Sequence, residues 1–431
     1  MNNLKHGDLV TFEFNGVEQD GLYSTSDYGI YIATNNPKMN GSSFGRVPKY
    51  EYSWKINSNI SQLRKKGTKY ERKVVPIVRT HLGCDPEFFF MEKGKVLSSE
   101  KVLPEVPSKE EAGMVTIDGV QAEINPTADT CRESHSYYIA RCIKKAHSYL
   151  KEGQTISFDP IVPIDLKVLA KLSDKAKFFG CTPSFNVYDS DNKMSIDDSS
   201  KYPFRPAGGH IHLGHSENES VKKIINNINL LVPMLDIIVG NTCVLIDRHD
   251  GNRERRRCYG RAGEFRTPKH GLEYRTLSNF WLNSYQLMSF VFGLARMAMS
   301  IVNSSTEKDN IAKEIMDAVN QDDIRRAIND NDFELALKNF SKIKPILNRV
   351  MPIGSTLCSE NMIQFLYFVG KVQKEGLKYW FKQNPVDYWV NYGNSIGGRG
   401  KGWERFLSED VREDMSKATQ LLKKIRATIK R

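Results

Sequence analysis

Five short segments of the sequence carry carboxylate, imidazole or guanidinium side chains spaced two residues apart on runs typical of β-strands. Alternate residues of a strand face the same side and lie about 7 Å apart. In the first segment, Asp85 and Glu87 flank Pro86 and precede three phenylalanines. Such a pair could hold two neighbouring metal ions, or one metal ion and a phosphate, although a solvated strand end is equally consistent with it. Because Pro86 lacks an N–H group, this strand is predicted to lie at a sheet edge or to contain a bulge.

The second segment places Gln121, Glu123 and Asn125 on one face of a predicted strand, after a tight-turn signal at Asp118-Gly119. Amide and carboxylate oxygens are the hard ligands that Mg²⁺ prefers. Taken alone, an antiparallel strand with one solvated face explains the pattern slightly better than a metal site does.

The third segment, GGHIHLGH at residues 208–215, contains three of the nine histidines. His210 and His212 would lie side by side on a strand, where neutral imidazoles can ligate a metal or donate to a phosphate. The flanking glycines allow the backbone to approach a ligand closely. Zinc is the rival metal, but the sequence has neither HExxH nor cysteines at zinc-ligand spacing. The cluster therefore favours a functional site.

The fourth and fifth segments are Arg261-Ala-Gly-Glu264-Phe-Arg266 and Glu273-Tyr-Arg275. Guanidinium groups suit bidentate phosphate recognition better than ammonium groups do. Four more arginines lie just upstream, between residues 253 and 257, and about half of these are expected in a solvated loop.

Together, the five segments offer acids for divalent cations, histidines, and arginines that could neutralise phosphate. These are the requirements of phosphoryl transfer, in which catalysis is mostly positioning and charge neutralisation. The sequence has no Walker A motif and no protein-kinase motif set, so a nucleotide would be held in another way.

The surrounding pattern predicts three regions. Residues 1–57 alternate like strands and suggest a small β-barrel of SH3 or KOW type, followed by a polar linker at 58–70. Residues 74–301 mix short strands with helices, including a buried apolar helix within 219–246. Residues 306–431 are predicted helical, with a basic amphipathic helix at 409–431 and a glycine-rich loop at 395–403.

Composition indicates which binding partners and which cellular location to expect. The chain has 431 residues, 40% of them apolar, and a formal net charge of +11, which suits nucleotides, nucleic acid or an anionic substrate without choosing among them. Seven scattered cysteines without a CxxC pair indicate reduced thiols rather than disulfides. With neither a signal peptide nor a membrane span predicted, the cytoplasm is the expected location, or the host cytoplasm if a phage encodes the protein.

The same segments resemble the amidoligase superfamily, which comprises the carboxylate–amine ligases related to glutamine synthetase and glutamate–cysteine ligase, and in particular the phage-type amidoligases of the second type. The resemblance runs from about residue 83 to residue 281, in the order GCDPEFFF, DGVQAEINP, GCTPSF, RPAGGHIHLG, YGRAGEFR and GLEYRTLSNFW. It implies an α+β fold with a glutamine-synthetase-like curved antiparallel sheet and helices, which would make residues 74–301 the catalytic domain.

The resemblance also implies residue roles. Five residues would be metal ligands, with aspartate replacing one glutamate of the family's ExE strand: Asp85, Glu87, Glu123, His210 and Glu273. The nucleotide or its phosphates would contact His212, Arg266, Arg275 and Gln121. Arg261, Arg266 and Arg275 would neutralise the transferred phosphoryl group as catalytic residues. One further metal carboxylate, expected before the Gln121–Glu123 strand, has no clear match, and Asp118 is the candidate for it.

The implied reaction uses ATP with Mg²⁺, or Mn²⁺, to join a carboxylate to an amine of an amino acid, peptide or protein through an acyl phosphate. Two alternatives stay open. One is a nucleic-acid-binding protein whose ligase-like domain is not catalytic. The other is a phosphotransferase that acts on a small carboxylate or guanidine with the same sheet.

Overall fold

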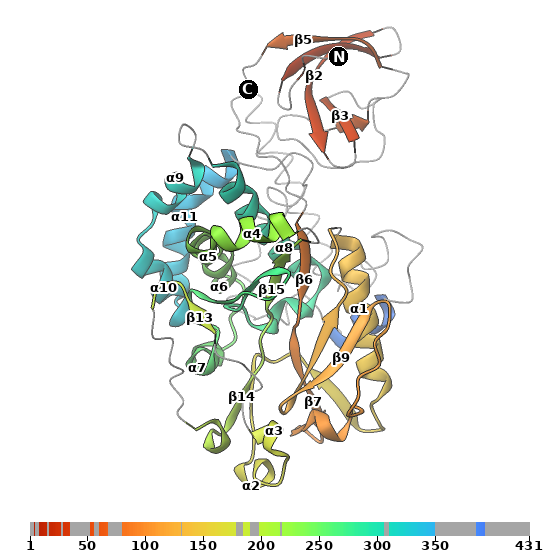
Figure 1. Cartoon of the computed structure of the whole chain (residues 1–431), viewed down its shortest axis with the longest axis vertical. Coiled ribbons are helices and arrows are strands. Elements are labelled where there is room, and N and C mark those ends of the chain that lie inside the picture. The colour runs from red at the N-terminus through yellow and green to blue at the C-terminus, as the bar shows by residue number, and fades with distance from the viewer. Residues whose placement is uncertain are drawn as a thin grey trace.

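The computed structural model describes residues 8–14, 17–26, 29–34, 52–55, 60–67, 80–130, 132–177, 184–189, 198–215, 218–305, 310–349 and 385–392, together with residue 4 (Figure 1). Four of the seven cysteines lie in these ranges, at 84, 142, 243 and 258, and all four are buried and outside any disulfide.

The N-terminal strands form one antiparallel sheet in the order β4-β3-β2-β1-β5. Their bounds are Leu9–Phe14 (β1), Val17–Ser26 (β2), Gly29–Thr34 (β3), Tyr52–Lys55 (β4) and Ile60–Gly67 (β5). Among the described strands, β4 and β5 are the edges, so closure into a barrel of SH3 or KOW type stays a prediction.

The polar linker predicted at residues 58–70 is wrong at residues 60–67. Residues 60–67 pair with β1 as strand β5. Strands at a sheet edge are held by backbone hydrogen bonds on one side and commonly carry lysines, which protect the edge from unwanted pairing. The basic sequence LRKKG was therefore mistaken for a linker.

The central sheet is antiparallel, in the order β13-β16-β17-β15-β6. Its strands are Phe185–Asn186 (β13), Glu264–Arg266 (β16), Gly271–Tyr274 (β17), Ile211–Gly214 (β15) and His81–Cys84 (β6). The register sets His212 opposite Gly83 on one side and opposite Glu273 on the other, and Glu273 opposite Arg266. One face of this sheet therefore carries the polar residues that the sequence singled out.

A second antiparallel sheet continues from the first, in the order β11-β7-β10-β9, with β8 also paired to β7. Its strands are Glu87–Glu92 (β7), Lys95–Leu97 (β8), Gly113–Asp118 (β9), Gln121–Pro126 (β10) and Gln154–Ser157 (β11). A bridge between Leu82 and Asp129 joins the two sheets, and the result is a curled antiparallel half-barrel in a mixed α and β fold. A separate two-stranded sheet pairs Ile161–Pro163 (β12) with Phe204–Pro206 (β14).

The single strand predicted through Asp85 and Glu87 is two strands. Strand β6 ends at Cys84 and β7 begins at Glu87, so the chain leaves the first sheet and enters the second at Asp85-Pro86. The break follows from the missing N–H of Pro86, which cannot continue a ladder on both sides. The backbone N–H of Glu87 instead donates to the carbonyl of Gly208, next to β15.

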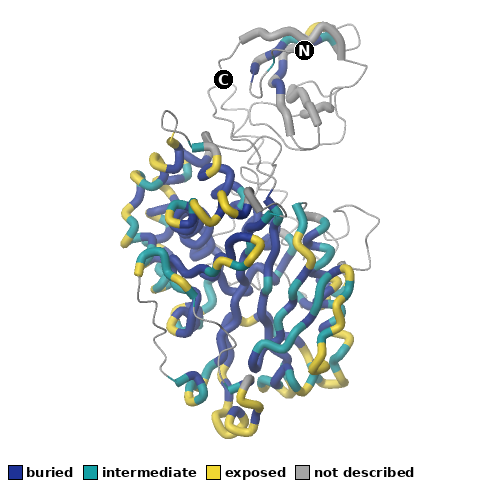
Figure 2. Tube along the Cα trace, in the orientation of Figure 1, coloured by how far each residue is buried: buried dark blue, intermediate teal, exposed yellow. Residues whose placement is uncertain are grey.

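The apolar face of the central sheet is covered by helices, and Figure 2 shows this interior as the most buried part of the molecule. The covering segments are Ile228–Leu235 (α5), the π-helix Asp236–Gly240, Asn241–Val244 (α6) and Tyr285–Ser304 (α8). One hydrophobic cluster contains Leu82, Leu213 and Leu272 from the strands together with Leu235 and Val291 from the helices. The predicted buried helix within 219–246 is therefore confirmed, with a π-helical turn in its middle.

The other helices are Arg132–Ser148 (α1), Leu166–Leu169 (α2), Asp174–Lys177 (α3), Asn218–Asn226 (α4), Asn252–Cys258 (α7), Ile311–Ala318 (α9), Gln321–Asn329 (α10), Phe333–Arg349 (α11) and Pro385–Tyr392 (α13), with 3-10 turns at Ser99–Lys101, Ser199–Lys201 and Asn279–Asn283. The helical prediction for 306–431 is confirmed where α9, α10, α11 and α13 lie, whereas the loop at 395–403 and the helix at 409–431 fall outside the described residues. No helix in the described part of the chain has the length and apolar character needed to span a membrane.

Candidate functional site

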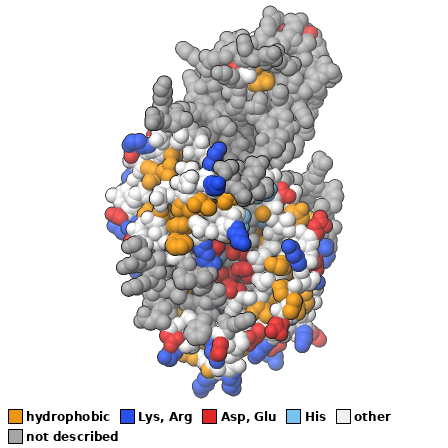
Figure 3. Space-filling model, in the orientation of Figure 1, with side chains coloured by type: hydrophobic (Ala, Val, Ile, Leu, Met, Phe, Trp, Pro, Cys, Tyr) orange, Lys and Arg blue, Asp and Glu red, His pale blue; other side chains and the backbone are white. Residues whose placement is uncertain are grey.

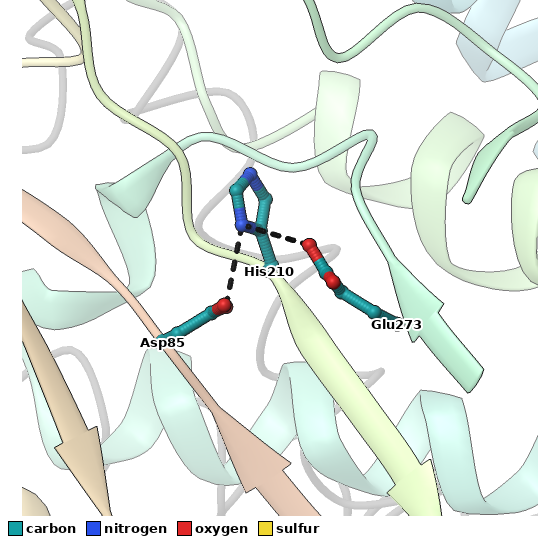
Figure 4. A group of neighbouring side chains, drawn as sticks. All are labelled: Asp85, His210 and Glu273. Carbon is teal, nitrogen blue, oxygen red and sulfur yellow. Dashed lines mark ion pairs between the residues drawn. The ribbon is translucent and has the colours of Figure 1, made fainter. Parts of the chain in front are cut away.

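Asp85, His210 and Glu273 converge on one point of the central sheet, each from a different segment (Figure 4). Asp85 follows β6, His210 precedes β15, and Glu273 lies on β17. Nδ1 of His210 is 3.2 Å from Oδ1 of Asp85 and 3.5 Å from Oε1 of Glu273. His210 and Glu273 are buried, and the Asp85 side chain is only 13% exposed.

These contacts are close ion pairs, and the oxygens of Asp85 and Glu273 also have His212 and Arg275 at ion-pair distance, but none of the contacts has well-formed hydrogen-bond angles. Within the described structure, Nδ1 of His210, Oδ1 of Asp85 and Oε1 of Glu273 are all buried and lack a hydrogen-bond partner. A buried polar group without a partner costs free energy, so such groups call for an explanation such as an ion. Three ligand atoms that converge without hydrogen-bond angles are arranged as they would be around a cation.

Glu87, Asp118 and Glu123 form a second group, built from the other sheet. The three residues lie on β7, β9 and β10, and Glu123 is directly opposite Glu87 in the β10–β7 pair. The ligand atoms within each of the two groups lie within 4.8 Å of one another. All five predicted metal residues therefore fall into two groups, and Asp118, the candidate for the missing carboxylate, completes the second.

Two carboxyl groups of the second group have raised pKa values, because the acids are buried close together. Burial, together with the charges of Glu87 and Asp85, raises the pKa of Asp118 to about 7. Burial and the charges of Asp85, Asp118 and Glu87 likewise raise the pKa of Glu123 well above 4.5. A divalent cation would relieve this repulsion, which Arg275 and Arg266 offset only in part at Asp118.

The opposite shift occurs at Asp85. Burial opposes ionisation there, but the neighbouring His212 and His210 outweigh it and lower the pKa of Asp85 below 3.8. Burial alone would lower the pKa of His212, yet Asp85 and Glu273 raise it above 6.5. Asp85 therefore stays ionised as a potential ligand.

His212 lies beside the first group and reaches outward from it. Its Nε2 is 3.0 Å from Oδ1 of Asp85, and its Nδ1 is 2.9 Å from Nε2 of His270. The His212 and His270 rings stack with centroids 5.0 Å apart. Gly83 faces His212 across the strand pair, and a Cβ there would come within 3.3 Å of the His212 Cβ. Glycine at this position leaves room for the His212 side chain on the sheet face.

Guanidinium groups approach the first group from the side of Glu273. Oε1 of Glu273 is 3.1 Å from Nε of Arg275 and 3.6 Å from Nη1 of Arg266. Arg275 is buried, whereas the Arg266 side chain is 24% exposed. Arg261 lies farther along, with its Nε 3.3 Å from Oε1 of Glu264. Figure 3 shows acidic and basic side chains gathered side by side near the middle of this face.

The side-chain amide of Gln121 is bonded outside both ligand groups. Its side-chain amide donates to the carbonyl of Pro206 at 2.9 Å and is buried, so it links β10 to β14. The solvated loop predicted for residues 253–257 is a helix, α7, although half of the four arginines are indeed solvated. Arg255 and Arg256 are buried, while Arg253 and Arg257 are exposed.

The sequence did not identify Tyr259 or His270 as site residues, nor Asn125 as a hydrogen-bond donor to Glu123. The hydroxyl of Tyr259 donates to Oε2 of Glu87, and Nδ2 of Asn125 donates to Oε1 of Glu123 at 2.7 Å. Asn125 could have been found, because it shares a strand face with Glu123. Tyr259 and His270 lie between regular elements, where side-chain direction follows no period.

The donor atoms fit divalent cations. The second group offers only carboxylate oxygens, which suits a hard cation such as Mg²⁺. The first group adds one imidazole to two carboxylates, a set that also accepts Mn²⁺. The mutual repulsion of the carboxylates in the second group points to a missing positive charge, and the three ligand atoms of the first group converge without well-formed hydrogen bonds.

Comparison with known proteins supports the resemblance seen in the motifs. Residues 192–354 match a family described as phage phiEco32-like COOH.NH2 ligase-type 2. The matched segment includes His210, His212 and Glu273, while Asp85, Glu87 and Glu123 precede it. A search of curated proteins found no match. The family's description is that of a carboxylate–amine ligase, in agreement with the predicted family.

Proposed function

We propose that this protein, which matches the ligase family over residues 192–354, is an ATP- and Mg²⁺-dependent carboxylate–amine ligase on a glutamine-synthetase-like sheet. The observation that supports it best is the pair of ligand groups on the half-barrel: Asp85, His210 and Glu273 in one, and Glu87, Asp118 and Glu123 in the other. Two such groups side by side suit the phosphates of a nucleotide, whose charge must be neutralised for phosphoryl transfer.

The reaction we propose has two steps. An oxygen of the substrate carboxylate attacks the γ-phosphorus of ATP and releases ADP, which gives an acyl phosphate. The nitrogen of an amine then attacks the acyl carbon, loses a proton and expels inorganic phosphate. No covalent bond to the protein is needed, so the protein's part is to position the reactants and to compensate charge.

Each group of residues has a separate part in this scheme. When bound, Mg²⁺, or Mn²⁺ in its place, would neutralise phosphate oxygens. Arg266 and Arg275 would compensate the charge of the moving phosphoryl group, with Arg261 at the more exposed end. His212 would contact the nucleotide's phosphates. We leave Gln121 out of the nucleotide contacts, because its amide already donates to Pro206.

A screen of amino acids and peptides for phosphate release tests this proposal. Release should require ATP, Mg²⁺, a carboxylate and an amine together. Mass spectrometry should find an amide whose mass is that of the two substrates less one water. Glu87→Gln and Glu123→Gln should abolish release without changing the melting temperature much. Glu92→Gln is the matched control, because Glu92 lies on the same strand as Glu87 but is exposed.

Three other results would overturn the proposal. A phosphorylated end product without an amide would make the protein a phosphotransferase. Salt-sensitive binding of nucleic acid without ATP turnover would make it a binding protein. Full turnover in both Glu87→Gln and Glu123→Gln would remove the proposed metal ligands from the reaction.

A further inference from the structure

Tyr259 lies directly after helix α7 and is only 3% exposed, in contact with residues of both ligand groups. Its hydroxyl donates to Oε2 of Glu87, which belongs to the second group. Its ring packs edge to face with the imidazole of His210, which belongs to the first, with centroids 5.7 Å apart and planes at 64°. One buried side chain thus contacts both groups.

The oxygens of Glu87 show what the hydroxyl does. Oε2 accepts the hydroxyl of Tyr259 and also the backbone N–H of Gly208, at 2.8 Å for the latter. With both donors on Oε2, Oε1 is left available as the oxygen of Glu87 that could bind a cation. Glu123 repeats the arrangement, since Oε1 accepts from Asn125. Donors that hold one oxygen of a ligating carboxylate fix its orientation and tune its affinity for metal.

The ring of Tyr259 also packs against the guanidinium of Arg275. The guanidinium of Arg275 lies over the ring, 5.3 Å from its centroid, and the same guanidinium has Nε 3.1 Å from Oε1 of Glu273. A cation over an aromatic face is attracted to it, more strongly so where both are buried. A displacement of Tyr259 would therefore disturb Glu87, His210 and Arg275 together.

We propose that Tyr259 is a positioning residue, which orients Glu87 for monodentate metal binding through Oε1 and sets the distance between the two ligand groups. The proposal rests on the two cation positions of the proposed function. It predicts that removal of the hydroxyl alone weakens one of two metal ions and leaves the other nearly unchanged, because the hydroxyl donates to Glu87, which belongs to the second group.

The test is a Mn²⁺ titration of the full-length protein, followed by electron paramagnetic resonance of the free ion and by calorimetry. The wild type should bind two ions. Tyr259→Phe, which keeps the ring against His210 and Arg275, should weaken one ion by about tenfold or more. Tyr202→Phe is the matched control, because its hydroxyl also donates to a carboxylate, that of Glu254, outside either ligand group. The control should bind both ions as the wild type does.

A double variant separates positioning from a general loss of packing. Glu87→Gln should itself weaken the same ion, and adding Tyr259→Phe to it should have little further effect, because the two residues act through one contact. Additive effects, or two unchanged affinities in Tyr259→Phe, would overturn the inference while leaving the proposed function intact. A wild-type protein that binds no Mn²⁺ would overturn both.

Discussion

The imidazole of His210 is buried between the carboxylates of Asp85 and Glu273, with Nδ1 3.2 and 3.5 Å from their oxygens, in close contacts that lack well-formed hydrogen-bond angles in the described structure. Buried charges are normally paired, hydrogen-bonded or bound to metal. At the scale of single residues, a cation is the simplest partner for these atoms, and the folded protein should gain stability from it.

The first prediction follows from that gain. Mg²⁺ or Mn²⁺ should raise the melting temperature, since a ligand that binds only the folded state adds about 2.7 kcal/mol at one hundred times its Kd. Differential scanning fluorimetry with chelator, then with added Mg²⁺, measures the shift. Potassium chloride at equal ionic strength should give a much smaller shift. If Asp85→Asn combined with Glu123→Gln showed the full Mg²⁺ shift, the ligand assignment would be wrong.

The second prediction concerns Arg275. Its buried guanidinium contacts Glu273, Ser184 and the face of Tyr259 at once, a set that an ammonium cannot reproduce. Arg275→Lys should reduce kcat on the order of 100-fold, a loss typical of removing a preorganised electrostatic contact. Arg326→Lys, at an exposed position on α10, is the control and should leave phosphate release unchanged. A kcat within a factor of about two of the wild type would contradict the role of Arg275.

At the scale of elements, strand β17 is held from behind by the π-helix Asp236–Gly240. Tyr274 donates to Oδ1 of Asp236 at 2.7 Å, and its neighbours Glu273 and Arg275 face the site. Gly240 makes the fit possible, because a Cβ there would come within 2.6 Å of the Tyr274 hydroxyl. π-helical turns within α-helices are frequent near functional sites. Here the turn brings a carboxylate to the back of the strand that carries Glu273.

The third prediction is a pH dependence of stability from Asp236. Burial raises the pKa of Asp236 from 3.8 to about 7, and the hydrogen bond from Tyr274 only partly offsets this. The folded protein therefore binds a proton more tightly than the unfolded chain, so Asp236 costs stability as pH rises from about 4 to about 7. The cost is at most about 1.4 kcal/mol per pH unit. Asp236→Asn should gain stability relative to the wild type across that range.

Melting temperatures of both proteins between pH 4.5 and 8 give the measurement. The difference between variant and wild type should grow toward pH 7 and then level off. Asp317→Asn, at an exposed ion pair on α9, should track the wild type at every pH. Parallel pH profiles for Asp236→Asn and the wild type would show that Asp236 is ionised in the folded protein at all these pH values.

The elements also show how far sequence reasoning could go. Period-two alternation correctly grouped Glu273 with Arg275, and Glu123 with Asn125, because a strand fixes which side chains share a face. It could not show that Pro86 sends Asp85 and Glu87 to different ligand groups, since that depends on which strands pair. The sequence could not reveal Tyr259 for a similar reason. Its partner Glu87 is 172 residues away, and the contact between them follows no local sequence pattern.

At the scale of the whole molecule, helix α13 returns to the body that carries the site. Trp389 is fully buried, and its indole N–H donates to the carbonyl of Leu282, in the 3-10 turn that precedes helix α8. Helix α13 also packs against α1. Helix α13 is therefore part of the same packing unit as the strands, although it follows them by more than one hundred residues in the sequence.

The fourth prediction tests this packing. Trp389→Ala should destabilise the protein by about 3–5 kcal/mol, because it removes a large buried side chain and leaves a cavity. Asn391→Ala, two residues later on the exposed side of α13, is the control and should change little. Thermal unfolding with a probe of the central sheet reports the effect. An unchanged melting temperature in Trp389→Ala would mean that α13 contributes nothing to the stability of this body.

The central claim is that two ligand groups on one curled sheet bind two neighbouring divalent cations. Anomalous scattering from crystals soaked with Mn²⁺ and a non-hydrolysable ATP analogue tests it most directly. The account predicts two manganese peaks, one bounded by Asp85, His210 and Glu273 and the other by Glu87, Asp118 and Glu123. Well-ordered side chains at both positions with no manganese between them would contradict it.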